Sequence, residues 1–250
     1  MPELGFRARR LFVDASLFEG QTVALKRDQG NYLGNVLRLD TGDTILVFNG
    51  RDGEWRARIA SRKRPDSLII QDRTRPQDRL PDLAYLFAPL KHARLDYMVQ
   101  KAVEMGVACL QPVLTRFTQV RRVNGERMRA NVIEAAEQCG NLSLAAVADP
   151  VPLDRFLGAR DSKRLLVFCD EAFGVADPLA ALHASATTQG VDVLIGPEGG
   201  FAEEERTLLL RQRQTLRLSL GPRILRADTA GVAALALVQA ALGDWTAPAK

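Results

Sequence analysis

Cysteine and histidine, the residues that most often build disulfides and metal centres, are scarce in this chain of 250 residues. There are three cysteines, Cys109, Cys139 and Cys169, and two histidines, His92 and His183. The cysteines are odd in number, widely spaced and without a Cys-x-x-Cys pair, which excludes a disulfide framework and a structural zinc site. We therefore expect no metal, and reduced cysteines that fill the core of a cytoplasmic protein.

Long apolar runs are missing as well. No stretch reaches the roughly 18 apolar residues that a membrane-spanning helix requires, and the first ten residues lack the apolar segment of a secretory signal. The sequence therefore predicts a protein with neither a membrane span nor an export signal.

Charge of one sign is not abundant, since the net charge is only +4. Its distribution is uneven, however. Residues 1–80 contain 15 Lys and Arg against 11 Asp and Glu, a surplus of 4, whereas residues 81–250 contain 19 of each. A basic surplus confined to one module favours nucleic-acid binding, although charge alone fits a solvated surface equally well.

Short β-prone segments separated by turn residues occupy the first third of the chain. Strands are expected at 10–13, 22–25, 44–48, 54–59 and 67–71, with one helical segment at 29–39. Strands this closely spaced predict a small β-barrel. In the fourth strand Ala57 and Ile59 should face the core while Arg56 and Arg58 face outward. The polar, proline-containing residues 73–82 are typical of a linker, so we expect domains at 1–74 and 83–250 joined by residues 75–82.

Strands and helices alternate from residue 83 onward. Strands are expected at 84–88, 107–113, 164–169, 191–195 and 215–220, and helices before Gly106 and at 126–140, 203–213 and 228–242. This alternation predicts an α/β domain with a parallel sheet covered by helices on both faces.

One strand-to-helix turn is unusually rich in glycine. An apolar strand ends in Gly-Pro-Glu-Gly-Gly at residues 196–200, and a helical pattern with three glutamates follows. Turns at the carboxyl ends of such strands commonly bind ligands. This turn has no phosphate-loop lysine and carries the carboxylate of Glu198, which favours a neutral or cationic ligand over a nucleotide phosphate. An ordinary strand-to-helix turn is the alternative.

Five further segments complete a recognisable set. Residues 218–230 repeat the strand, Gly-Pro turn and helix, and they are joined by Met-Val-Gln-Lys-Ala-Val-Glu-Met-Gly-Val at 98–107 and Glu-Ala-Ala-Glu-Gln-Cys-Gly at 134–140. In the first domain, Arg-Arg-Leu-Phe-Val at 9–13 and Val-Leu-Arg at 36–38 belong to the same set. Over nearly its whole length the chain resembles the RsmE family, which methylates N3 of a uridine in 16S ribosomal RNA.

This resemblance implies a PUA-like RNA-binding barrel followed by a methyltransferase domain of the SPOUT superfamily, which has a C-terminal trefoil knot. It also implies a homodimer, S-adenosyl-L-methionine as cofactor, and the 16S ribosomal RNA of the small ribosomal subunit as partner. The last helix, apolar on most sides, is consistent with a dimer interface. Two alternatives remain: a SPOUT methyltransferase acting on a different RNA nucleotide or a ribose hydroxyl, and a non-catalytic RNA-binding protein.

The family's site residues carry over to positions in this sequence. The cofactor is expected to contact three loops, through Phe168, Glu171, Ile195, Gly196, Pro197, Glu198, Gly199, Gly200, Leu218, Leu220, Gly221, Ile224, Leu225 and Thr229. Catalytic roles are expected for Arg223, Arg226 and Asp228, and RNA contacts for Arg9, Arg10 and Arg38.

Several of these roles have an alternative. Arg223 and Arg226 could orient the uridine or its phosphate, or could be surface arginines paired with Asp228 or Glu205. Glu198 could contact the cofactor's ammonium or adenosine, or could accept backbone N–H groups at a helix start. Thr229 could touch the ligand or cap its helix. No general base stands out, and Asp228 is the nearest candidate by position.

The chain also departs from the family pattern at several positions. Tyr32 replaces a frequent histidine, Asn141 follows the Glu-Gln-Cys-Gly segment in place of arginine, and Asp228 stands for glutamate. Ala202 replaces a serine or threonine and cannot cap its helix, a loss of about 1 kcal/mol. The following glutamates partly offset that loss through the helix dipole.

Overall fold

The structure is a computed structural model that describes residues 9–60, 65–170, 173–174, 177–185 and 189–246. The chain forms two compact units. Unit 1 comprises Met1–Arg79 together with Ile133–Leu144, and unit 2 comprises Leu80–Val132 together with Ala145–Lys250. Within the described ranges no helix combines the length and the apolar character needed to cross a membrane.

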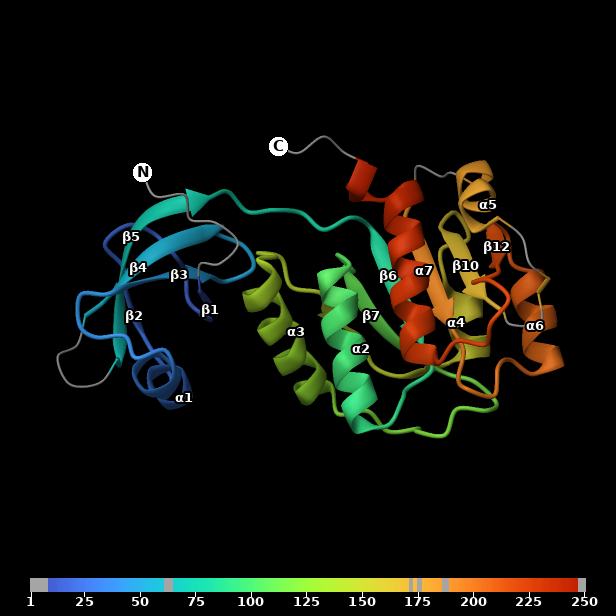
Figure 1. Cartoon of the computed structure of the whole chain (residues 1–250), viewed down its shortest axis with the longest axis horizontal. Helices are drawn as coiled ribbons and strands as arrows, with labels where there is room; N and C mark the ends of the chain where they lie inside the picture. The colour runs from blue at the N-terminus through green and yellow to red at the C-terminus, as the bar shows by residue number, and fades with distance from the viewer. Residues whose placement is uncertain (1–8, 61–64, 171–172, 175–176, 186–188, 247–250) are drawn as a thin grey trace. The chain divides into compact units, whose positions relative to one another are not determined.

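Unit 1 is built on a five-stranded sheet with the order β1-β3-β4-β5-β2 (Figure 1). Strand β1 pairs with β3 in parallel, and the other neighbours are antiparallel. A short helix continues into a π-helical turn between the second and third strands. The elements are β1 (Arg10–Phe12), β2 (Thr22–Ala24), α1 (Arg27–Asn31), the π-helix η1 (Tyr32–Val36), β3 (Thr44–Phe48), β4 (Glu54–Ile59) and β5 (Ser67–Arg75).

The side-chain alternation predicted for β4 is confirmed. Ala57 and Ile59 are fully buried, whereas Arg56 and Arg58 are only partly buried. The buried pair joins a core drawn from every strand of the unit and from Leu33 of η1. Because successive side chains of a strand point to opposite faces, the positions of the apolar residues determine which face of this sheet is buried.

Strand β5 is longer than the sequence indicated, because it runs to Arg75 and takes in residues 73–75 of the segment expected as a linker. Trp55 is paired with Arg73 and Glu54 with Arg75 across the β4–β5 ladder. The carboxylate of Glu54 neutralises Arg75 in that pair. A polar composition looked like a linker in the sequence because the cross-strand partner of Arg75 was not visible there.

Unit 2 is a parallel α/β sheet with the order β12-β10-β11-β6-β7-β8, and a further strand, β9, pairs with β7. Every pairing in it is parallel, as predicted. The elements from residue 83 onward are β6 (Leu83–Phe87), α2 (His92–Glu104), β7 (Cys109–Leu114), α3 (Gly125–Cys139), β8 (Ala146–Val147), β9 (Val151–Pro152), α4 (Leu153–Ala159), β10 (Leu165–Cys169), α5 (Pro178–Ala184), β11 (Val191–Ile195), α6 (Glu203–Leu210), β12 (Thr215–Leu218), α7 (Ala227–Leu242) and the 3-10 turn η2 (Asp244–Thr246). Helix α3 is divided between the units, since its residues from Ile133 onward belong to unit 1. The trefoil knot implied by the resemblance stays a prediction.

Helices cover both faces of this sheet, which confirms the expected layering. On one face α4 and α6 bury leucines against Leu86, Leu166 and Leu194 of three neighbouring strands. On the other face α7 packs beside α2 (Figure 1), and the ring of Tyr85 reaches the backbone of Gly231 on α7. A Cβ at that glycine would lie 2.2 Å from the Tyr85 hydroxyl oxygen, so only glycine allows α7 to approach the sheet here.

The end of α2 follows the sequence expectation. Gly106, predicted to end that helix, has φ +74°, the left-handed conformation that favours glycine after a helix. The buried side chain of Gln239 on α7 donates a hydrogen bond to the carbonyl of Met105, the last turn of α2. A carbonyl at the end of α2 that has no partner within the helix is thereby hydrogen-bonded by α7. This contact holds the two helices side by side.

Candidate functional site

A pocket of about 150 Å³ lies in unit 2 where β10, β11 and β12 end. Its wall consists of residues 169–170 after β10, 195–198 after β11, 219–225 after β12, and Ala227 and Ala230 of α7. The carboxyl ends of parallel strands meet at one edge of a sheet, which is where α/β proteins bind ligands. Both Gly-Pro segments singled out in the sequence therefore contribute to one cavity.

Nine of the residues predicted for this site line the pocket. They are Ile195, Gly196, Pro197, Glu198, Leu220, Gly221, Arg223, Ile224 and Leu225. Seven others, Phe168, Gly199, Gly200, Leu218, Arg226, Asp228 and Thr229, lie outside the lining. Glu171 falls outside the residues that the structure describes. Cofactor contact stays a prediction for each of these positions.

The structure explains why two of these seven, Phe168 and Leu218, do not line the pocket. Phe168 points to the α4–α6 face of the sheet, where its ring meets Phe201 edge-on with centroids 6.1 Å apart. Leu218, at the end of β12, is almost completely buried. Both side chains belong to the core beneath the pocket, so any contribution they make to a ligand comes through the backbone.

The Gly-Pro-Glu-Gly-Gly turn is held by a backbone hydrogen bond from the Gly200 N–H to the Pro197 carbonyl, 2.9 Å long. Gly200 has φ +69°, which suits glycine. At Gly196 a Cβ would come within 3.0 Å of the Phe201 ring. The glycine thus lets the backbone pass over that ring, and the ring fixes where the pocket wall begins.

The N-cap residue of helix α6 is Ala202, whose side chain makes no capping hydrogen bond, as expected. The Glu205 carboxylate accepts the Ala202 N–H at 3.0 Å and also the Arg116 N–H at 2.7 Å. This supplies half of a capping box and ties the loop after β7 to the helix start. Because Glu205 is engaged in this way, the suggested pairing with Arg223 or Arg226 is not seen.

Asp170 was missed in the sequence, although it follows directly on β10 and lines the pocket. Its side chain is completely buried, and two guanidinium groups reach it, from Arg206 of α6 at 3.2 Å and from Arg217 of β12 at 2.8 Å. Arg217 also lies over the Phe173 ring, 4.9 Å from its centroid. A carboxylate shared by two arginines joins three elements around the pocket.

Glu198 pairs with Arg94 of α2 at 3.6 Å, and both side chains are about half exposed. An exposed pair of this kind contributes little to stability. The suggested capping of a helix by Glu198 is not observed, because Glu205 accepts the N–H at the start of α6. A carboxylate at the pocket wall with so weak a partner is available to a cationic group.

Arg223 and Arg226 are both exposed and lie in the segment directly before α7, with Ile224 and Leu225 between them. Across the described ranges neither guanidinium pairs with a carboxylate, so the proposed surface pairing with Asp228 or Glu205 is absent. Asp228 lies in the first turn of α7 and accepts the Thr229 N–H at 2.8 Å. A carboxylate there interacts favourably with the helix dipole. Among the described residues Thr229 makes no hydrogen bond that caps α7.

Cys169 also lines the pocket. Burial raises the pKa of its thiol to about 12, and the charge of Asp170 acts in the same direction. The thiol is therefore protonated at neutral pH and is not a nucleophile. The residue as a whole is only partly buried, so its expected role as a core filler stays a prediction.

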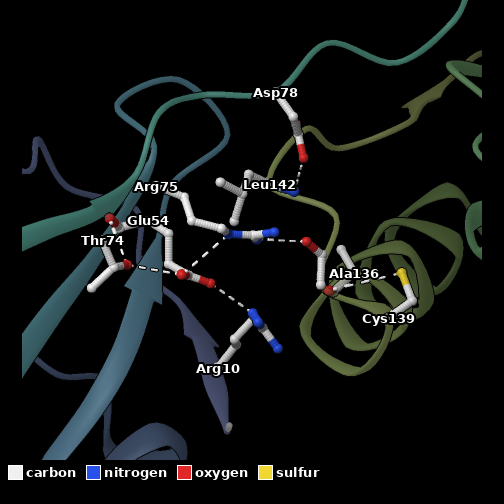
Figure 2. Close-up of polar contacts among 9 residues, drawn as sticks. Arg10, Glu54, Thr74, Arg75, Asp78, Ala136, Cys139 and Leu142 are labelled. Carbon is white, nitrogen blue, oxygen red and sulfur yellow. Dashed lines mark hydrogen bonds and ion pairs between the residues drawn. The ribbon is translucent and has the colours of Figure 1, made fainter. Parts of the chain in front are cut away.

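Unit 1 carries the residues predicted to bind RNA, and Arg10 does not fit that prediction. Its side chain is 5% exposed, and its Nε lies 2.7 Å from the Glu54 carboxylate (Figure 2). Thr74 Oγ1 and Arg75 Nε donate to the other oxygen of Glu54, and Arg75 reaches on to the Gly140 carbonyl (Figure 2). Arg10 is thus part of an internal ion-pair network and cannot present its charge to a phosphate.

The Glu-Gln-Cys-Gly segment at the end of α3 has a structural role in unit 1. Glu137 accepts the Phe12 N–H at 2.8 Å, and a Cβ at Gly140 would come within 3.3 Å of the Arg10 guanidinium. Asp78 accepts the Leu142 N–H at 2.8 Å (Figure 2). These contacts attach residues 133–144 to the sheet of unit 1.

Arg9 and Arg38 differ from Arg10, since both are exposed. Arg9 Nη1 donates to the carbonyl of Leu37 at 3.2 Å, so its guanidinium lies next to the backbone of Arg38. Over the described part of the chain neither arginine forms an ion pair. The structure thus brings together two of the three predicted RNA contacts.

Comparison with protein families gives two matches. Residues 77–239 match the model described as an RNA methyltransferase domain, and residues 25–71 match the model described as an RNA methyltransferase PUA domain. The first match alone spans more than half of the chain.

Curated relatives agree along nearly the full length. The ribosomal RNA small subunit methyltransferase E of Rickettsia conorii is 30% identical over 232 residues, which is 92% of this chain and 94% of the relative. The protein of the same name from Synechocystis is 31% identical over 239 residues, 94% of this chain and 78% of the relative.

Solved structures are similar over the same extent. A putative methyltransferase from Legionella pneumophila, in complex with the bound cofactor S-adenosylmethionine, has a TM-score of 0.81 and 31% identity, covering 94% of this chain and 98% of the other. A ribosomal RNA small subunit methyltransferase E from Neisseria gonorrhoeae, bound to S-adenosylmethionine, has a TM-score of 0.81 and 27% identity, covering 96% and 100%.

Proposed function

The chain belongs to the RNA methyltransferase family whose curated members are named ribosomal RNA small subunit methyltransferase E, and from this premise we propose that it methylates 16S ribosomal RNA with S-adenosylmethionine as methyl donor. The fold class expected from the sequence, a PUA-like unit followed by a parallel SPOUT-type α/β domain, agrees with this membership. The observation that carries the proposal is the pocket formed by two Gly-Pro loops at the strand ends of unit 2.

The pocket suits this cofactor chemically. Two glycine-containing loops supply most of its lining residues, none of the described lining residues is a lysine, and Glu198 provides a carboxylate for an ammonium group. Its 150 Å³ are fewer than the roughly 300–1,000 Å³ of typical ligand sites, so the ligand would extend over the exposed segment 221–224. When bound, S-adenosylmethionine supplies a methyl group on a positively charged sulfonium.

The acceptor is N3 of a uridine, as the resemblance implies. That atom must lose its proton, and negative charge then spreads onto the neighbouring carbonyl oxygens. Among the described residues neither Arg223, which lines the pocket, nor Arg226, three residues further on, has an ion-pair partner, and a planar, permanently charged guanidinium suits those oxygens or an adjacent phosphate. Because N3 lies on the pairing edge, the uridine must be unpaired or flipped out when it enters.

Asp228 is a weak base candidate because it lies outside the pocket lining and accepts the N–H of its neighbour. We assign it to positioning the start of α7, which carries Ala227 and Ala230 into the pocket wall. Proton loss from the acceptor to bulk water, favoured by the two arginines, requires no carboxylate from this helix.

A homodimer and a cytoplasmic location complete the proposal. Val232 and Leu237 of α7 are apolar and only partly buried, which supports an apolar face that a second copy would cover. The proposed substrate, in the small ribosomal subunit, supports a cytoplasmic location. Analytical ultracentrifugation of the full chain tests the dimer, and a monomer at micromolar concentration would contradict it.

The test of the activity is methyl transfer from tritium-labelled S-adenosylmethionine to 16S ribosomal RNA and to intact small subunits, taken from cells lacking the gene. We expect one N3-methyluridine per RNA, with Arg226→Ala strongly impaired and Arg211→Ala, an exposed arginine at the end of α6, unaffected. Label on another nucleotide or on a ribose would favour a different RNA methyltransferase. Failure to bind S-adenosylmethionine in calorimetry would exclude both enzymes and leave an RNA-binding protein.

A further inference from the structure

The end of the helical segment in unit 1 combines two uncommon backbone conformations. Residues Tyr32–Val36 form a π-helix, closed by a hydrogen bond from the Leu37 N–H to the Tyr32 carbonyl, 2.9 Å long. Arg38 follows with φ +55°, a left-handed conformation that residues other than glycine rarely adopt. Short π-helices and strained backbone gather at functional sites.

Two apolar side chains on this π-helix face solvent. Tyr32 is 38% exposed and Val36 is 62% exposed, whereas Leu33 beside them is completely buried. Leu33 belongs to the core of unit 1, whereas neither Tyr32 nor Val36 belongs to that core. Over the part of the chain that the structure describes, the Tyr32 side chain has no hydrogen-bond partner.

Two arginines lie close to the C-terminal end of the same π-helix. Arg9 donates a hydrogen bond, 3.2 Å long, to the carbonyl of Leu37, which lies one helical turn after Tyr32. Arg38 directly follows Leu37 in the chain. The acidic residues nearest along the chain are Asp28 of α1, four residues before Tyr32, and Asp40, two residues after Arg38, whose N–H is accepted by the Asp43 carboxylate. The surface thus offers an aromatic ring and two guanidinium groups that no carboxylate of the described residues neutralises.

We propose that Tyr32 and Val36 form a platform for one unpaired RNA base, with Arg9 and Arg38 binding the phosphates on either side of it. A single-stranded nucleotide presents a flat ring between two negative charges, which matches this arrangement. The charge complementarity argues against an apolar protein partner, because two side chains bury little area and the arginines would need acidic partners as well. The inference rests on the proposed function for the identity of the ligand as RNA, and it names the residue that stacks.

The platform distinguishes unpaired from paired RNA. In a duplex the base faces are covered by their neighbours, so Tyr32 can stack only on a base that is splayed out or single-stranded. Phosphate contacts by the arginines, in contrast, depend on charge and respond to salt, with a slope in log Kd against log salt of about 0.7 per contact for single strands. Stacking and charge can therefore be separated in one titration.

The experiment measures binding of the full chain to a fluorescein-labelled, unstructured 12-nucleotide RNA and to the same sequence as a blunt duplex, at four salt concentrations. Tyr32→Ala and Tyr32→Leu should weaken binding to the single strand by about tenfold, within the range reported for loss of one stacked base, with no change in salt slope. Tyr32→Phe should bind within about twofold of the wild type, because the ring remains. Arg38→Gly, which keeps the left-handed backbone accessible, should lower the slope by about 0.7.

Phe18→Ala is the matched control, since Phe18 is an exposed aromatic residue of the same unit, 54% exposed, without an arginine pair assigned beside it. Its binding should equal that of the wild type. The proposal is overturned if Tyr32→Leu binds like the wild type, if Phe18→Ala loses as much as Tyr32→Ala, or if the duplex binds as tightly as the single strand.

Methyl transfer to 16S ribosomal RNA is measured in parallel. A wild type that binds the single strand through Tyr32 but transfers no methyl group contradicts the proposed function alone. A wild type that methylates normally while Tyr32→Leu binds unchanged contradicts the platform alone.

Discussion

Removing the charge of Asp170 should destabilise unit 2 far more than removing the charge of Glu198, although both residues line the same pocket. Asp170 is completely buried between Arg206 and Arg217, whose side chains are 20% and 26% exposed. Loss of one partner from a buried pair costs about 3–5 kcal/mol, because the remaining charge is left without compensation. Since both arginines keep some contact with water, we take the lower end, about 3 kcal/mol, for Asp170→Asn.

Glu198 gives the matched control, because its pair with Arg94 is half exposed on both sides. Such a pair contributes about 0–1 kcal/mol, so Glu198→Gln should leave stability nearly unchanged. The difference between the two variants is thus about 2–3 kcal/mol, which follows from burial, since both substitutions replace an acid with its amide.

The measurement is urea unfolding without ligand, followed by circular dichroism and by hydrogen exchange at the amides of β10 and β12. Exchange is needed because a chain of two units need not unfold in one step. Asp170→Asn should also weaken binding of S-adenosylmethionine, because the ends of both strands carry pocket residues. The reasoning fails if Asp170→Asn is as stable as the wild type, or if Glu198→Gln costs more than Asp170→Asn.

Three further predictions concern single contacts. Gly196→Ala places a methyl group about 3.0 Å from the Phe201 ring and should weaken S-adenosylmethionine binding about tenfold in calorimetry. The control Gly158→Ala, at a position where no atom lies within 4 Å of the new Cβ, should bind the cofactor normally. Equal affinities of the two variants would contradict the close approach of Gly196 to the ring. Arg10→Ala should lower the stability of unit 1 by about 3 kcal/mol and leave the salt slope of RNA binding unchanged. Arg9→Ala, in contrast, should lower that slope. A lower slope for Arg10→Ala would show that Arg10 does contact RNA. Burial raises the pKa of Glu137 above its ordinary value of 4.5, against the opposing effect of the Phe12 N–H, so the folded state holds the proton more tightly than the unfolded chain and stability falls as the pH rises through this window. Glu137→Gln, whose amide oxygen can still accept that N–H, should therefore match or exceed the wild-type Tm at pH 7 and lose this advantage at pH 4; an advantage that grows toward pH 4 would show that the sign is wrong.

Much of the architecture could be predicted because the periodicity of apolar residues is local. The bounds of β3, β4 and β11 agree with the sequence to the residue, and the parallel order in unit 2 follows from the alternation of strands and helices. The short elements β8, β9, α4 and α5 were not predicted. Each is stabilised by what it packs against, as Leu153 and Leu157 of α4 are by the sheet, and a segment of seven residues carries too few periods to be recognised alone.

The site was predictable where backbone chemistry leaves a mark in the sequence. Glycine and proline mark the two loops of the pocket, and nine of the residues assigned to the site line it. Side-chain partners leave no such mark. Arg10 looked like Arg9 in the sequence, because a neighbouring arginine in the same segment gives no sign that Glu54, 44 residues away, will bury it. Asp170 was overlooked for the same reason, since Arg206 and Arg217 are distant in sequence.

The membership of residues 133–144 in unit 1 has a consequence for synthesis. During translation the strands β1 to β5 emerge first, but the partners of Phe12, Arg75 and Asp78 at the end of α3 emerge only about 65 residues after β5 is complete. We expect a fragment ending at residue 79 to be readily digested by proteases, and one ending at residue 144 to resist. The order of the chain thus delays completion of the unit that bears the arginines until β6, α2 and β7 of the methyltransferase domain have been synthesised.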